Sequence, residues 1–244
     1  MARNAGIERA CGEFLCFVDA DDCLMSQTLE IMTAVAEESG AQICSCSFVK
    51  GVEFHDSKVK RYKVKTYDYV GILSEALYQK KLINSAWGMI VKRDLVKEAG
   101  GFREGVWYED LDSFYRIYEL AAKIAYIDAP LYFYRQNPGS FLHRWSDGRL
   151  DVLDVTDRMV DYLGERYPEL KSAAMDRRFS AHYNMALLML RNGVDRPDAM
   201  ERCLAVIREG RRKALLDRRV RLKNKVGALV SYFGLPTLRL LSKL

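Results

Sequence analysis

The sequence contains few of the residues that mark unstructured or metal-rich proteins. Its 244 residues include only 5 prolines and 3 histidines, and 49% of them are apolar. These proportions exclude collagen-like and disordered chains and indicate a globular protein with a sizeable core. Every uninterrupted apolar run is much shorter than the roughly 18 residues of a membrane-spanning helix, so we expect no transmembrane segment. The N-terminal residues do not resemble a secretory signal, and we expect a cytoplasmic protein.

The six cysteines have no spacing typical of a zinc site. None of them forms a CxxC pair, and no histidine cluster accompanies them. In a reducing cytoplasm we expect free thiols, some of them packed as small hydrophobic residues. The cysteines are Cys11, Cys16, Cys23, Cys44, Cys46 and Cys203.

The net charge of +5 is unevenly distributed along the chain. Residues 201–244 hold twelve Lys or Arg and three acidic residues, a net charge of +9, which leaves −4 for the first 200 residues. Residues 208–244 also contain an amphipathic stretch, a combination that an anionic membrane surface attracts. A solvated helix face or a protein-binding helix is the alternative. We expect no nucleic acid binding, because this segment lacks a regular series of aromatic residues.

The hydrophobic pattern divides the chain into an α/β part, residues 1–140, and a helical part, residues 141–244. Short apolar runs predict buried strands, and apolar residues at a spacing of three or four predict helices. The run at 13–18 is typical of a buried parallel strand. The first part is also predicted to contain strands at 41–49 and 86–91, an exposed hairpin or edge strand at 59–67, extended segments at 123–127 and 131–135, and helices at 3–11, 26–38, 68–79 and 109–122.

Three carboxylates, Asp19, Asp21 and Asp22, follow the first predicted strand. In open α/β sheets, ligands bind beyond the carboxyl ends of the strands. Carboxylates two residues apart can share a divalent cation, and Mg²⁺ is usually held by one or two of them together with phosphate oxygens. The turn therefore predicts a metal site. In the simpler alternative, one Asp caps the next helix and the others are solvated.

Two classes of enzyme use such an acidic turn. In an aspartate-nucleophile phosphatase the first Asp becomes phosphorylated. In a nucleotide-sugar transferase the acidic pair holds a metal on the diphosphate of the donor. The phosphatase pattern has Thr or Val at its fifth position, where this chain has Cys23, so the transferase is favoured.

The residues around the turn carry a longer resemblance. Residues 2–22 read ARNAGIERACGEFLCFVDADD and closely resemble the signature of glycosyltransferase family 2. Two later blocks also resemble that family: VWYEDLD at 106–112 and AYIDAPLYFYR at 125–135. The resemblance implies a GT-A fold for about residues 2–140. The family's opening strand and base-reading segment have no counterpart before Ala2, so we expect an incomplete, Rossmann-like mixed sheet with a C-terminal helical appendage.

The family's chemistry is an inverting transfer of a sugar from a nucleotide diphosphate donor. The resemblance implies that Asp110 is the general base for the acceptor hydroxyl. It places Arg3, Asn4, Asp19 and Asp22 at the donor. On the acceptor side it places Glu109 and Trp87. It makes Asp21 and Asp19 the ligands of Mg²⁺ or Mn²⁺, with His143 as a further candidate ligand.

Simpler roles exist for most of these residues. Glu109 and Asp110 can simply place negative charge in the first turn of a helix. Trp87 can belong to the core, and a lone histidine such as His143 is more often structural. Because the three blocks occur together, we expect a transferase that uses a UDP-linked sugar and a glycan or lipid-linked acceptor in surface polysaccharide biosynthesis. It would lie at the cytoplasmic face of a membrane. The alternative is an inactive remnant that binds a nucleotide, a metal or a partner.

Overall fold

The computed structural model describes residues 2–80, 85–137 and 145–242. The chain forms two compact units. The α/β unit consists of Met1–Ala76, Lys81–Gly105 and Glu109–Gly139. The helical unit consists of Ser140–Leu244 together with two short segments, Leu77–Lys80 and Val106–Tyr108. The units are therefore interleaved in sequence at two points.

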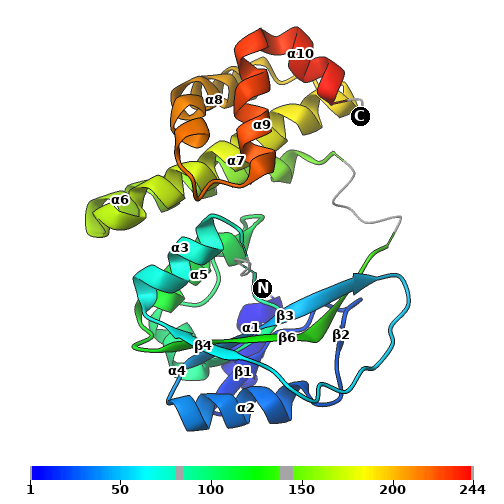
Figure 1. Ribbon diagram of the computed structural model, residues 1–244, viewed down its shortest axis with the longest axis vertical. Helices are drawn as coiled ribbons and strands as arrows, with labels where there is room; N and C mark the ends of the chain where they lie inside the picture. Colours follow the sequence, from blue (N-terminus) through cyan, green and yellow to red (C-terminus); the bar gives the residue numbers. More distant parts are fainter. Residues whose placement is uncertain (1, 81–84, 138–144, 243–244) are drawn as a thin grey trace. The chain divides into compact units, whose positions relative to one another are not determined.

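A mixed sheet forms the centre of the α/β unit, as Figure 1 shows. The two long strands at its centre, β3 and β6, run parallel, and the other strand pairings are antiparallel. A further strand, β4 (Val64–Tyr67), also pairs with β6 and is not part of the main strand order. That order is β1 (Phe14–Cys16), β5 (Met89–Lys92), β3 (Ile43–Gly51), β6 (Ile124–Arg135) and β2 (Cys23–Leu24).

Two details of the sheet differ from the sequence-based prediction. The run at 13–18 forms a strand, but β1 pairs antiparallel with β5, because an apolar run specifies burial and not strand direction. The two extended segments predicted around Pro130 form one strand, β6. Pro130 lies opposite Ser47, where the register between β3 and β6 shifts, so the missing N–H of proline falls at an irregularity of the ladder.

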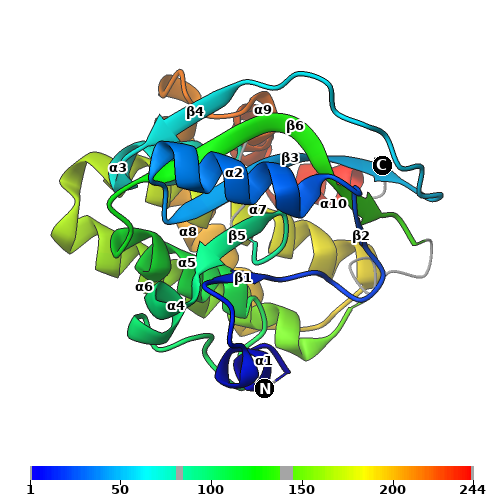
Figure 2. The ribbon, with the colours of Figure 1, turned by 90° about the horizontal axis from the view of Figure 1, so that it is seen from below.

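Helices cover both faces of this sheet (Figures 1 and 2). The helix α2 (Thr28–Ser39) buries Met32 and Val35 against strand residues such as Cys44 and Ile127, which form the core of the unit. It ends at Gly40, whose φ of 67° is the left-handed conformation that glycine adopts easily. The helices α3 (Tyr69–Leu77) and α5 (Glu109–Glu119) lie on the other face. Two shorter helices are α1 (Ala2–Arg9) and α4 (Arg93–Glu98).

The helical unit is organised around one long helix, α7, which packs against α6, α8, α9 and α10. In the described parts of both units, no helix is long and apolar enough to cross a membrane. The helices of this unit are α6 (Asp151–Arg166), α7 (Lys171–Asn192), α8 (Pro197–Leu216), α9 (Leu222–Val230) and α10 (Gly234–Leu241), with single 3₁₀ turns η2 (Asp147–Leu150), η3 (Pro168–Leu170) and η4 (Ser231–Phe233).

The two short segments from the N-terminal part are held in the helical unit by specific contacts. The buried Tyr78 donates its hydroxyl hydrogen bond to Asp217 Oδ2 at 2.5 Å. The backbone N–H of Trp107 donates to Asp151 Oδ2 at 2.8 Å. The Trp107 indole lies so close to Gly148 that a Cβ there would come within 2.5 Å of it, and only glycine allows this approach.

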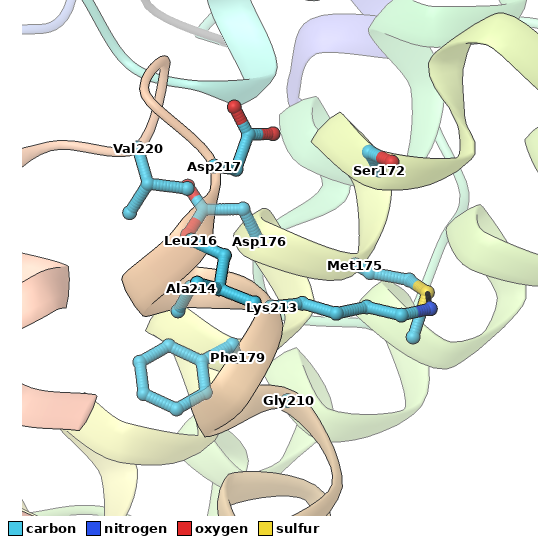
Figure 3. A pocket seen from close by; sticks show the side chains of 10 residues that line it. All are labelled: Ser172, Met175, Asp176, Phe179, Gly210, Lys213, Ala214, Leu216, Asp217 and Val220. Carbon is cyan, nitrogen blue, oxygen red and sulfur yellow. Dashed lines mark hydrogen bonds between the residues drawn. The ribbon is translucent and has the colours of Figure 1, made fainter. Parts of the chain in front are cut away.

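A cavity of about 340 Å³ lies between α7, α8 and the loop that follows α8 (Figure 3). Phe179 and Leu216 line it, together with the carboxylates of Asp176 and Asp217. Burial raises the pKa of Asp176, while a hydrogen bond from Asn224 Nδ2 at 3.0 Å partly offsets that effect. This interaction attaches α9 to α7.

A charged network ties α6, α7 and α8 together beside a buried histidine. Arg178 and Arg202 both donate to Asp157, the latter at 2.6 Å. The completely buried His182 donates from Nδ1 to the Arg178 carbonyl, 3.0 Å away, and its Nε2 has no hydrogen-bond partner among the described residues. Burial lowers the pKa of His182 from 6.5 to about 4.

We expect acid to destabilise this unit through His182. Between pH 6.5 and about 4 the unfolded state binds a proton that the folded imidazole does not, so the free energy of unfolding falls as the pH falls. In His182→Gln this pH dependence should shrink by roughly 1–3 kcal/mol. Urea unfolding followed by circular dichroism at several pH values measures it. His55→Gln, at a histidine that is 84% exposed, is the control. An unchanged pH slope in His182→Gln would contradict the prediction.

Candidate functional site

The side chain of Arg3 joins the two acidic segments that the sequence singled out. From α1 it donates through Nη2 to Asp19 Oδ1 at 3.0 Å and through Nη1 to Glu109 Oε1. Its guanidinium also lies over the ring of Phe102, 5.6 Å from the centroid. The three charged side chains are each about one-third exposed, so a ligand can reach them. The structure thus brings the acidic turn and the start of α5 into one site.

Asn4, the next residue of α1, points to a neighbouring loop. Its Nδ2 donates to the Phe102 carbonyl at 2.8 Å, and its Oδ1 accepts the Phe102 N–H at 3.0 Å. Gly101, with a φ of +66°, lets the loop pass close to this amide. Asn4 therefore anchors α1, which positions Arg3. The predicted contact of Asn4 with the donor stays a prediction.

The carboxylate of Asp22 is turned toward strand β6. Its Oδ2 accepts the hydroxyl hydrogen bond of Tyr132 at 2.6 Å, and its Oδ1 accepts the backbone N–H of Arg135 at 2.8 Å. Burial raises the pKa of Asp22, and the two hydrogen bonds act in the opposite direction. With both oxygens bonded, Asp22 fastens the acidic turn to the sheet. Its predicted contact with the donor stays a prediction.

Asp21 is exposed, in contrast to Asp22. Its Oδ2 accepts a hydrogen bond from Asn137 Nδ2 at 2.7 Å, and its carbonyl accepts one from Arg135 Nε at 2.7 Å. The pKa of Tyr134 is raised by burial and further by the three carboxylates of the turn, so the space beside the turn has a negative potential.

The chemistry of this turn fits a divalent cation that is shared with a substrate. The described residues contain no cluster of three or more His, Cys, Asp or Glu that could hold a metal by itself. Asp19 and Asp21 are nevertheless accessible carboxylates, and Mg²⁺ is usually held by one or two carboxylates plus phosphate oxygens. His143, the third predicted ligand, lies outside the described residues.

Trp87 belongs to an aromatic cluster next to the acidic turn. Its ring stacks on Tyr132 with the centroids 4.8 Å apart, and it also contacts Tyr134 at 5.4 Å and Phe48 at 5.0 Å. Because the hydroxyl of Tyr132 donates a hydrogen bond to Asp22, the aromatic cluster and the acidic turn are in direct contact. Trp87 is only half-buried, which suits both a packing role and a face for a ligand. Its acceptor role stays a prediction.

Asp110 lies in the first turn of α5, where the helix dipole favours a negative charge. Its Oδ1 accepts the backbone N–H of Leu111 at 2.7 Å. Tyr108 has a φ of 63°, a strained conformation for a residue with a side chain, and such strain is often found at functional sites. The neighbouring Asp112 is completely buried and bonded to Arg103 at 2.6 Å. Glu109 and Asp110 are therefore the accessible acids of this turn.

Sequence reasoning missed three residues that shape the site. Tyr132 and Arg135 were identified only as part of a strand that resembles the family, and Asn137 was not singled out. Alternate residues of a strand face opposite sides of the sheet, so the sequence indicates which strand residues share a face with Tyr132. It does not show that the Tyr132 hydroxyl reaches Asp22. The hydrogen bonds of Asp22 and Asp21 to these residues depend on the pairing of distant strands.

Comparison with known proteins identifies the family of the N-terminal part. Residues 1–100 match the family model of Glycosyl transferase family 2. The matched range contains Arg3, Asn4, the acidic turn and Trp87, whereas Glu109 and Asp110 lie beyond it. The family predicted from the sequence is confirmed.

Curated relatives are also glycosyltransferases. The chain is 27% identical over 204 residues to glycosyltransferase GlyA of Streptococcus pneumoniae, covering 79% of this chain and 28% of GlyA. It is 28% identical over 191 residues to the uncharacterized glycosyltransferase EpsJ of Bacillus subtilis, covering 76% of this chain and 51% of EpsJ. The chain thus spans between about a quarter and about half of the length of these two relatives.

Solved structures support the fold assignment. The crystal structure of S. aureus TarS 1–349 in complex with UDP-GlcNAc has a TM-score of 0.60 and 14% identity, and the match covers 98% of this chain and 67% of TarS 1–349. The same fragment in complex with UDP has a TM-score of 0.56 and 15% identity, with 99% and 69% covered. The α/β, GT-A-like fold predicted from the sequence is confirmed.

We expect Asp22 to contribute to stability and Asp21 not to. Asp22→Ala leaves the buried Tyr132 hydroxyl without its acceptor, which should lower the free energy of unfolding by about 1–3 kcal/mol. Asp21→Ala removes a single surface hydrogen bond, the one from Asn137, and should change it by less than about 0.5 kcal/mol. Urea unfolding measures both. In a double-mutant cycle, Asp22→Ala and Tyr132→Phe should be non-additive; additive effects would contradict the assigned role.

Proposed function

We propose that this chain transfers a sugar from a nucleotide diphosphate donor, UDP-linked, to a hydroxyl of a glycan or lipid-linked acceptor. The observation that carries the proposal is the Arg3 bridge, which brings Asp19 of the acidic turn and Glu109 of α5 together in a chain whose first 100 residues match the model of family 2. The bound UDP-GlcNAc and UDP of the TarS complexes support a UDP-linked donor. The site would serve surface polysaccharide biosynthesis.

In the proposed reaction Asp110 is the general base. Its carboxylate takes the proton of the acceptor hydroxyl while that oxygen bonds to the anomeric carbon. The bond from this carbon to the diphosphate oxygen breaks on the opposite side, so the configuration inverts. Asp110 lies in the first turn of α5, where the helix dipole favours a negative charge, and Glu109, fixed by Arg3, borders the acceptor. The half-buried Trp87 offers a flat apolar face for the acceptor sugar.

At the donor, Asp19 and Asp21 would hold Mg²⁺ or Mn²⁺ together with the diphosphate. A cation there neutralises the negative charge of the departing diphosphate. Arg3, paired to Asp19, keeps that carboxylate in place and adds positive charge beside the phosphates. Asp22 supports the site by holding the acidic turn, and Asn4 supports it by anchoring α1.

We expect Asp21→Asn to weaken nucleotide binding only when the metal is present. The amide keeps the shape of the side chain but removes the charge that attracts the cation. Titration calorimetry with UDP and Mn²⁺ should show roughly tenfold or more weaker binding. Asp94→Asn, at a carboxylate that is 88% exposed on α4, should bind as the wild type does. Equal binding by Asp21→Asn and wild type would remove Asp21 from the metal site.

For Asp110→Asn we expect loss of transfer with retained nucleotide binding. General-base catalysis typically contributes a factor of about 10² to 10⁴, so turnover should fall by that order. The assay follows UDP release from a panel of UDP-sugars with Mn²⁺ and saccharide acceptors, and the Mn²⁺-dependent Kd for UDP is measured in parallel. If nucleotide binding disappears together with turnover, Asp110 is not the base. Binding without any turnover in the wild type would instead favour the remnant.

We also propose that residues 208–244 place the chain at the cytoplasmic face of an anionic membrane. The support is the net charge of +9 in residues 201–244, which would attract acidic headgroups. This placement would bring the site near a lipid-linked acceptor. It concerns the helical unit and does not depend on the chemistry proposed for Asp110.

A further inference from the structure

Exposed apolar side chains are concentrated at the end of the helical unit. Among the described residues, fourteen large hydrophobic side chains are exposed, and seven of them fall between residues 216 and 240. Single exposed apolar residues are normal on protein surfaces, but a group of them indicates an interaction site. The seven are Leu216, Leu222, Val226, Leu229, Tyr232, Phe233 and Leu240.

Three of these residues form a stripe along α9. Leu222, Val226 and Leu229 are 77%, 48% and 55% exposed. Their spacing of four and three residues places them on one side of the helix, within an arc of about 60°. We call this set the α9 stripe. It has the spacing of a helix core face, but it is open to solvent.

The opposite side of α9 attaches the helix to its unit. Asn224, Gly227 and Ala228 are buried. Asn224 donates to Asp176 of α7 at 3.0 Å. A Cβ added to Gly227 would lie 2.7 Å from Cζ of Tyr183, so the helices touch through a glycine. Since this side is fixed by close contact and a buried hydrogen bond, α9 cannot turn its stripe inward.

The charges around the stripe select an anionic surface as its partner. Lys223 and Lys225 precede and follow Asn224 and so lie on the two flanks of the stripe. Residues 218–242 contain six Lys or Arg and no acidic residue, and of the six Arg219 is paired with Asp217 at 3.3 Å. A second copy of the chain would bring two such positive surfaces together, which like-charge repulsion opposes. An anionic lipid surface offers both negative charge and an apolar layer.

We infer that the α9 stripe inserts into the boundary between headgroups and acyl chains of an anionic bilayer, with Lys223 and Lys225 at the phosphates. An amphipathic helix with basic flanks lies in the plane of that boundary and buries its apolar face by several ångströms. Tyr232 and Phe233, in the 3₁₀ turn that follows α9, are exposed as well. The inference deepens the membrane placement proposed above and is independent of sugar transfer.

The test is vesicle flotation of the full chain. Vesicles of phosphatidylcholine mixed with phosphatidylglycerol should carry the wild type up the gradient, and vesicles of phosphatidylcholine alone should not. The triple variant Leu222→Ser, Val226→Ser, Leu229→Ser should partition at least about tenfold less into the mixed vesicles. Its matched control is Leu29→Ser, Val52→Ser, Val64→Ser, which removes three exposed apolar side chains from the α/β unit and should float like the wild type.

Two outcomes would overturn the inference. If the stripe variant floats as well as the wild type and salt releases both, the basic residues attract the membrane but the stripe does not insert. If the wild type does not float and light scattering shows a dimer that the stripe variant loses, the stripe is an interface between copies. Should the triple variant fail to fold by circular dichroism, Val226→Trp replaces it: brominated lipid must quench the added fluorescence, and absence of quenching rejects insertion.

Discussion

The guanidinium of Arg3 determines where the two acidic segments of the site can lie. Asp19 and Glu109 are far apart in the chain, and two carboxylates that approach each other repel unless a cation separates them. A planar guanidinium has several donors in a fixed fork, so it can bond both carboxylates at once. Ion pairs as exposed as these contribute only about 0–1 kcal/mol to stability. The effect of Arg3 is therefore to fix positions, and Asn4 supports it by anchoring α1.

The acidic turn depends in the same way on strand β6. The preceding strand, β1, has only three residues, and the turn is held from the other side by Tyr132 and the backbone of Arg135. This arrangement gives adjacent carboxylates different tasks. Asp22 gives up part of its hydration and accepts hydrogen bonds from two protein donors, while Asp21 stays exposed to water. A charge that remains hydrated and near the surface is the one that can exchange water for a cation and a phosphate.

The sequence predicted the elements whose pattern is local. The apolar periodicity placed α2 and α5, and the ordered motif identified the family, because each depends on residues close together in the chain. The direction of β1 and the continuity of β6 through Pro130 depend on pairing between distant strands, which an apolar run does not encode. The same limit applies to the site. Asp19, Asp21 and Asp22 are chemically identical in the sequence, and only their contacts with Arg3 and β6 distinguish them.

The apolar side of a surface helix normally faces the core of its unit, whereas the apolar side of α9 faces solvent. Its small and polar residues face the protein. The ring of Tyr183 leaves no space for a side chain at Gly227, and Asn224 donates a hydrogen bond to Asp176. The α9 stripe faces water. Apolar side chains that stay in water contribute nothing to folding, whereas removing them from water is favourable by about 25 cal/mol per Å². Packing inside the unit therefore cannot explain the stripe, and the flanking lysines limit the explanation to a surface that is both apolar and negative.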